Sequence, residues 1–107
     1  TAEYLRRRNP SQVSLVCMGL AARRPTDEDT LCAQYIRALL LGLPFDKEQA
    51  VETMRQGDGR RFFIPEDQSF APREDFDLCV QFDRFPYALP VRRDAEGRKY
   101  VEREIVQ

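Results

Sequence analysis

Val13-Ser14-Leu15-Val16-Cys17-Met18-Gly19, followed after a basic loop by Thr26-Asp27-Glu28-Asp29-Thr30-Leu31-Cys32-Ala33, decides the expected fold of this chain. The first stretch is a near-continuous apolar run that ends in glycine, which is typical of a strand covered on both faces. The second stretch begins a helix with three consecutive acids. In α/β proteins, sites are commonly built where a strand's carboxyl end meets the next helix. We therefore expect this strand–loop–helix junction to hold the functional site.

The helix that follows the acids is the longest expected element. Thr26 predicts its N-cap, with Asp29 three residues later in a capping-box position. Apolar side chains then recur at helical spacing until Gly42 and Pro44 end the pattern. One broad apolar face is expected, made by Leu31, Cys32, Tyr35, Ile36, Leu39, Leu40 and Leu43.

Shorter helices are expected on either side of this long one. Residues 2–8 predict a helix with a basic end, and Asp46 predicts the N-cap of a helix that closes at residues 57–59. Residues 60–71 are expected to be irregular, and a short helix follows Pro72. The residues expected in the core beside it are Phe76, Cys79, Val80 and Phe82, together with Cys17 from the strand.

The end of the chain changes to a period of two. Tyr87, Leu89 and Val91 alternate with polar residues, a turn follows at residues 94–97, and residues 100–106 alternate again. This pattern predicts a β-hairpin, and Pro90 suggests an edge strand or a bulge in its first arm. The order of elements predicts a mixed α/β fold, with residues 1–107 forming one domain at most.

Composition excludes several classes of function. Seventeen basic and eighteen acidic residues give a net charge of −1, which does not favour a nucleic-acid or membrane-surface partner. The longest apolar run, residues 38–43, is too short to cross a bilayer. The chain has no histidine, which excludes Ser-His and Cys-His nucleophile pairs, and histidine-based zinc sites, within this chain. Three scattered cysteines favour a reducing cytoplasm over a disulfide framework.

Three stretches resemble the C-terminal half of the 2-phosphosulfolactate phosphatase (ComB-type) family. They are Val13-Ser14-Leu15-Val16-Cys17-Met18-Gly19, then Glu28-Asp29-Thr30-Leu31-Cys32-Ala33, then Asp75-Phe76-Asp77-Leu78-Cys79 leading to Asp83-Arg84-Phe85. The resemblance runs over nearly the whole chain in the same order of elements. One departure is Gln34, where the family commonly has glycine.

This resemblance implies a Mg²⁺-dependent phosphatase that removes phosphate from 2-phospho-3-sulfolactate, a step toward coenzyme M. It also implies a three-layer α/β fold, a mixed sheet with helices on its faces, about twice as long as this chain. The remaining N-terminal half would carry its own aspartate-bearing motif. Thr1 is not an initiator methionine, so we expect a fragment or cleavage product of a longer protein that is inactive alone. A homo-oligomer is compatible with the sequence.

The three acids at the helix start are the first candidate site residues. Mg²⁺ prefers hard oxygen ligands, usually one or two carboxylates with water and phosphate oxygens. Acids at a helix start also have a purely structural explanation, because they cap it and interact with its dipole. The resemblance favours Glu28 and Asp29 as metal ligands, with Asp29 also catalytic, and leaves Asp27 as a cap.

Cys32 and the arginine doublets complete the candidate site. Cys32 lies on the first turns of the helix, where a lowered pKa would favour a catalytic thiolate, although the apolar face also suits a buried structural cysteine. Arg23 and Arg24 lead directly into the acidic helix and are the expected substrate-binding residues. Their forked donors suit a small phosphorylated anion, whereas the doublets at 60–61 and 92–93 are also explained as surface charge.

Two further expectations concern the hairpin and the class of protein. Asp83 and Arg84 are expected to pair with each other and hold the hairpin in place. The alternative to an enzyme is a non-catalytic α/β interaction domain that binds a protein or an anionic partner. Such a domain would use its basic doublets or the edge of its hairpin.

Overall fold

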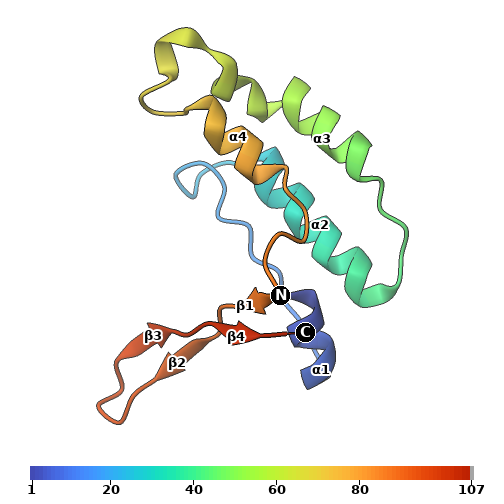
Figure 1. Ribbon diagram of the computed structural model, residues 1–107, viewed down its shortest axis with the longest axis vertical. Coiled ribbons are helices and arrows are strands. Elements are labelled where there is room, and N and C mark those ends of the chain that lie inside the picture. The colour runs from blue at the N-terminus through green and yellow to red at the C-terminus, as the bar shows by residue number, and fades with distance from the viewer. Residues whose placement is uncertain (107) are drawn as a thin grey trace.

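The computed structural model describes residues 1–106 of the chain, which fold into helices followed by a β-hairpin (Figure 1). The predicted mixed α/β class and the terminal hairpin are confirmed. The helices are α1 (Ala2–Arg8), α2 (Asp27–Leu41), α3 (Lys47–Gln56) and α4 (Arg73–Cys79), with 3₁₀ helices η1 (Asp58–Phe63) and η2 (Pro65–Asp67). The strands are β1 (Tyr87–Ala88), β2 (Val91–Arg93), β3 (Lys99–Val101) and β4 (Glu104–Ile105).

The ends of α2 and α3 follow local sequence signals. Gly42 terminates α2 in the left-handed conformation (φ 66°), which favours a residue without a Cβ. Asp46 caps α3 by accepting a hydrogen bond from the Gln49 backbone N–H at 2.9 Å, as predicted. Thr26 occupies the N-cap of α2, but its hydroxyl is buried and has no hydrogen-bond partner among residues 1–106. The position predicted for the cap is confirmed and the capping hydrogen bond is not.

The core lies where α3, η1 and α4 meet. Phe76 of α4 is 1% exposed and packs with Met54, Phe62 and Ala71. The Phe63 ring meets the Phe76 ring edge-on, with centroids 4.9 Å apart. Residues 60–71, expected to be irregular, therefore contribute aromatic side chains to the core from the 3₁₀ helix η1. Cys79 was expected in this core and is exposed instead.

The predicted buried strand over residues 13–18 is not formed. These residues have no regular secondary structure, and Val16 and Met18 are 79% and 68% exposed. Cys17 is exposed as well, so its predicted place in the core is also wrong. An apolar run becomes a buried strand only where other strands pair with it and helices cover both faces. In the described part of the chain, α1 and α2 supply the side chains beside it and no strand pairs with it.

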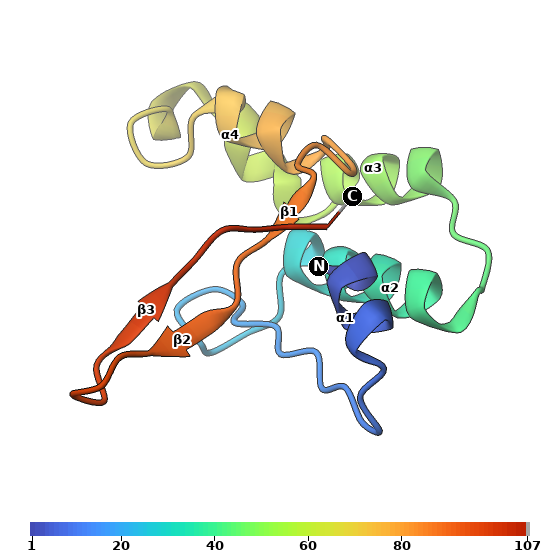
Figure 2. The ribbon, with the colours of Figure 1, turned by 60° about the horizontal axis from the view of Figure 1, so that its bottom comes forward.

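The hairpin keeps one register along its whole length. Tyr87 lies opposite Ile105, and Val91 lies opposite Val101, so no extra residue interrupts the antiparallel pairing. Pro90, which lacks an N–H, separates β1 from β2 without the bulge suggested by the sequence. The turn uses Gly97 at φ 80°, as three-residue hairpin loops require. β2 and β3 project away from the helices, whereas β1 lies beside them (Figure 2).

The helices of the described residues give no indication of a membrane span. Within residues 1–106, none combines the length and the apolar character that crossing a bilayer requires.

Candidate functional site

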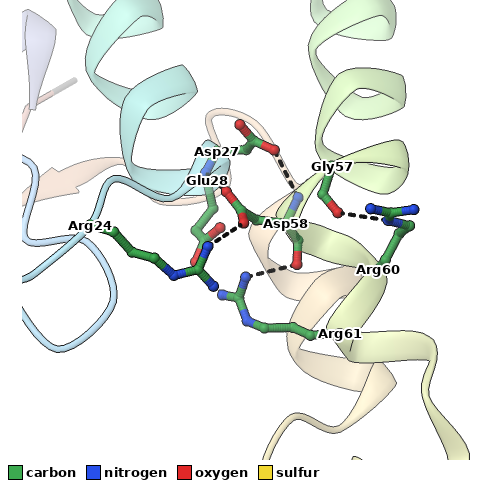
Figure 3. A network of polar contacts seen from close by, with 7 residues as sticks. All are labelled: Arg24, Asp27, Glu28, Gly57, Asp58, Arg60 and Arg61. Carbon is green, nitrogen blue, oxygen red and sulfur yellow. Dashed lines mark hydrogen bonds and ion pairs between the residues drawn. The ribbon is translucent and has the colours of Figure 1, made fainter.

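Two helix starts meet beside the predicted site. The Asp27 backbone N–H donates to Asp58 Oδ2 at 3.2 Å, and the Asp58 N–H donates to Asp27 Oδ2 at 2.9 Å (Figure 3). Each carboxylate thus satisfies an N–H group that the other helix start would leave unpaired. Gly57 is needed here because a Cβ at this position would overlap the Asp27 carboxylate. Asp27 is therefore a cap, as predicted, but the start that it caps is that of η1.

Glu28 pairs with Arg61 next to this contact. Glu28 Oε1 accepts from Arg61, and the two side chains are only 20% and 25% exposed. Arg61 also donates to the Asp58 carbonyl at 2.9 Å, and Arg24 pairs with the Asp58 carboxylate at 3.3 Å. The other oxygen of Glu28, Oε2, is buried and has no hydrogen-bond partner among residues 1–106. This oxygen can still accept a hydrogen bond or bind a cation.

Asp29 points to a different part of the junction. Its Oδ2 accepts a hydrogen bond from the Gly19 backbone N–H at 2.7 Å, instead of completing a capping box with Thr26. Gly19 has φ 66°, and a Cβ there would overlap the Arg24 carbonyl. Asp29 therefore anchors the turn that leads back to Arg24. Its predicted capping-box contact is not formed, because the returning loop offers a closer donor.

Cys32 lies on the wall of an open cavity of about 810 Å³ between the helices and the segment before the hairpin. Glu28 and Cys79 line the same cavity. Partial burial, and then the nearby Asp29 carboxylate, raise the pKa of the Cys32 thiol. This direction is opposite to the one expected from a helix start. It favours the protonated thiol over the thiolate.

The predicted site residues are thus only partly brought together. Glu28 and Cys32 line the same cavity. Arg24 is connected to the Glu28–Arg61 pair indirectly, because it pairs with the carboxylate of Asp58, whose carbonyl accepts a hydrogen bond from Arg61. Arg23 lies in the exposed turn that precedes α2. Sequence reasoning missed the roles of Asp58 and Arg61. The only signal was the Arg60-Arg61 doublet after Gly-Asp-Gly, and nothing in it distinguishes the paired arginine from the exposed one.

The geometry suits Glu28 alone as a Mg²⁺ ligand, and it does not suit the predicted binding of one ion by Glu28 and Asp29 together. Neighbouring residues on a helix do not face each other, and Asp29 is directed to the Gly19 amide. Glu28 has a free buried oxygen, and Mg²⁺ often binds through one carboxylate plus waters and phosphate oxygens. Over residues 1–106, no three Asp, Glu or Cys side chains gather into a metal-binding group. A magnesium site here would therefore be completed by water, phosphate or other protein groups.

A second polar cluster holds the segment that leads into the hairpin. Asp83 Oδ2 accepts from the Tyr35 hydroxyl at 2.5 Å and from Lys47 at 3.1 Å. The hydrogen bond from Tyr35 is the main cause that lowers the pKa of Asp83. Arg84 instead donates to Gln81 at 2.8 Å, so the predicted Asp83–Arg84 pair is wrong. Asp83 still positions the hairpin, but through α2 and α3.

This cluster makes stability depend on pH. Because the folded pKa of Asp83 is lowered, its contribution is complete above the ordinary carboxyl pKa and is lost as the pH falls through the lowered value. We expect Asp83→Asn to cost about 1 kcal/mol or less of unfolding free energy at pH 7 and less than that at acidic pH, for example at pH 2. Urea unfolding at both values measures this. Asp77→Asn, an exposed control on α4, should show no such difference, and an equal change in both variants would contradict the assignment.

The comparisons with known proteins add no relative. No protein-family model, curated protein or solved structure matches this chain.

Proposed function

We propose that this chain contributes a metal-binding half-site to a Mg²⁺-dependent phosphatase that hydrolyses a phosphate monoester of a small anionic hydroxy acid. The substrate would resemble 2-phospho-3-sulfolactate and the product sulfolactate. One observation carries the proposal: Glu28 lines an open cavity, and its Oε2 is a buried carboxylate oxygen without a hydrogen-bond partner among residues 1–106. Leaving such an oxygen unbonded is costly, so a ligand that satisfies it is expected.

Each nearby residue has a role in this proposal. Arg61 holds Oε1 of Glu28 and so directs Oε2 toward the metal position. Arg24 and Arg61 each pair with a carboxylate, Asp58 and Glu28, so the positive charge that would favour an anionic substrate would come from the bound cation. Bound Mg²⁺ would withdraw charge from the phosphate oxygens. Cys32 is given no nucleophilic role, because its raised pKa keeps the thiol protonated.

The proposal extends to the larger protein that the resemblance implies. We propose that an N-terminal half supplies the remaining ligands, and that its strands complete a three-layer α/β sheet around residues 13–18. Asp29 would then act through the turn it anchors, by positioning Gly19 and Arg24. The three free thiols suit a reducing, cytoplasmic location. Use in coenzyme M formation belongs to the same proposal.

Paramagnetic Mn²⁺, used in place of Mg²⁺, tests the half-site in the chain itself. We expect Mn²⁺ to broaden the amide NMR signals of residues 26–32 first, and Glu28→Gln to weaken this binding at least about tenfold. Glu48→Gln, an exposed acid in the first turn of α3, is the matched control. Equal broadening in both variants would overturn the metal site. In the complete phosphatase, absence of Mg²⁺-dependent phosphate release from any phosphorylated hydroxy acid would overturn the enzyme proposal.

A second candidate function, the interaction domain, is favoured by the hairpin. One face of the hairpin carries the ion pairs of Arg92 with Glu102 and Glu104. The opposite face carries apolar side chains that are 58–65% exposed, and its charged side chains are all basic. Its residues are Leu89, Val91, Val101 and Ile105, with Arg93, Lys99 and Arg103.

This face would suit an apolar partner with acidic residues at its edge. The interaction domain predicts that Mn²⁺ leaves residues 26–32 unaffected in the test above. It also predicts that a Val91→Glu variant folds normally while losing partner binding.

A further inference from the structure

Residues 12–18 have a sequence typical of a β-strand, but no neighbouring strand among residues 1–106 pairs with them. Among residues 1–106, no backbone hydrogen bond involves these seven residues. None of them has a positive φ, so their backbone meets no steric obstacle to pairing as a strand. Seven consecutive residues with unpaired N–H and C=O groups form an open template for another strand.

The side chains of this segment divide into two sets. Val13 and Leu15 are 38% and 36% exposed and line a hollow of about 530 Å³ with Leu5, Leu40 and Leu41. Val16 and Met18, at the alternate positions, project into solvent. This alternation is that of a strand with one side turned toward the helices. The other side is uncovered and carries Gln12 and Ser14 beside the apolar Val16 and Met18.

The whole chain exposes more surface than a protein of its size does when folded alone. Its accessible surface is 8262 Å², whereas a monomer of 12.5 kDa is expected to expose about 6200 Å². The radius of gyration is 15.9 Å, against about 13 Å for a compact domain of this length. The excess of about 2100 Å² is spread over the whole chain, and the exposed Val16 and Met18 belong to the surface that a second copy could cover.

The charge of the segment favours a second copy as the occupant. Residues 9–22 contain no charged side chain, and the chain as a whole has a net charge of −1. Edge strands of monomeric proteins usually carry a lysine, a proline or another device that prevents pairing. No such residue stands between Pro10 and Arg23. An uncharged apolar strand is self-complementary, which a two-fold interface requires, because antiparallel pairing sets no like charges opposite each other.

We propose that two copies of this chain associate through residues 12–18, which pair as antiparallel strands across a two-fold axis. The pairing satisfies the open backbone groups along one edge of each segment and places Val16 and Met18 beside cross-strand neighbours of the second copy, which reduces their exposure. The other edge stays available to further strands. This inference concerns association and does not rest on the phosphatase proposal, since its readout is mass and amide protection and not metal binding or activity.

Sedimentation equilibrium of the chain tests this proposal, together with amide hydrogen exchange. We expect a defined species of twice the 12.5 kDa chain mass, with protected amides within residues 12–18. Val16→Glu should raise the dimer dissociation constant about a hundredfold or more, because the substitution enters the interface twice. Phe70→Glu is the matched control, since Phe70 and Val16 are both 79% exposed and Phe70 lies outside the segment.

Three results would overturn the proposal. The first is a chain that remains monomeric even at 100 times the protein concentration at which the dimer is first looked for. The second is a dimer that Val16→Glu leaves intact, and the third is the formation of aggregates of undefined mass. Met18→Lys serves as a second variant, and circular dichroism confirms that each variant keeps its helices. A dimer that both segment variants dissociate and Phe70→Glu does not would support it.

Discussion

Phe76→Ala is expected to lower the free energy of unfolding by about 3–5 kcal/mol. Phe76 is the most completely buried side chain described, at 1% exposed. It connects α4 to η1 through Phe62 and Phe63, whose ring centroids lie 6.2 Å and 4.9 Å away. Truncation would leave a cavity that few neighbours can fill. Because small domains are stable by only about 5–15 kcal/mol, much of the fold depends on this residue.

Urea unfolding followed by circular dichroism measures this loss as a lower midpoint at unchanged slope. Phe70→Ala is the matched control, because Phe70 is 79% exposed and lies three residues before α4. Its effect should stay within about 0.5 kcal/mol. Similar losses in the two variants would show that the core does not lie between α3, η1 and α4.

Arg61→Met is expected to cost about 2–4 kcal/mol, because it leaves the Glu28 carboxylate largely buried without its cation. The two side chains are 25% and 20% exposed, so solvent screens this pair less than a surface ion pair. Arg61 also loses its hydrogen bond to the Asp58 carbonyl. The substitution thus acts on α2 and η1 together.

The neighbouring arginine supplies the control for this prediction. Arg60 is exposed and, within residues 1–106, its side chain donates only to the Gly57 carbonyl at 3.3 Å, so Arg60→Met should change stability by less than about 0.5 kcal/mol. Adding Glu28→Gln to Arg61→Met should recover most of the loss, since no buried charge then remains. If both arginine variants cost the same, or the double variant recovers nothing, the Glu28–Arg61 pair is not the cause.

Local signals explain why some parts of the fold could be predicted. Asp46 and Gln49 are three residues apart and cap α3 whatever surrounds them. Gly42 ends α2 because a left-handed residue is needed within the same turn. The hairpin likewise depends on alternation and on a glycine in its own loop. In each case the residues that decide the structure are near neighbours in the chain.

The candidate site could be predicted only in part, because its contacts join distant residues. Glu28 was identified as a site residue, but its cation comes from position 61, thirty-three residues later. Asp29 was expected to cap its own helix, and it binds the returning Gly19 amide instead. The pattern of a helix start predicts that acids are favoured there. It does not predict which distant donor each acid will bind.

By itself, the sequence determined the limits of α2 and α3, the terminal hairpin and the acidic start of α2, because these follow from propensities and hydrogen bonds within a few residues. The tertiary structure alone decided that Asp27 and Asp58 interlock, that Arg61 and not Arg60 pairs with Glu28, and that residues 13–18 pair with no strand within residues 1–106. A strand differs from a helix in this respect. Its backbone hydrogen bonds need a neighbour from elsewhere, so an apolar run cannot become a buried strand from its own residues.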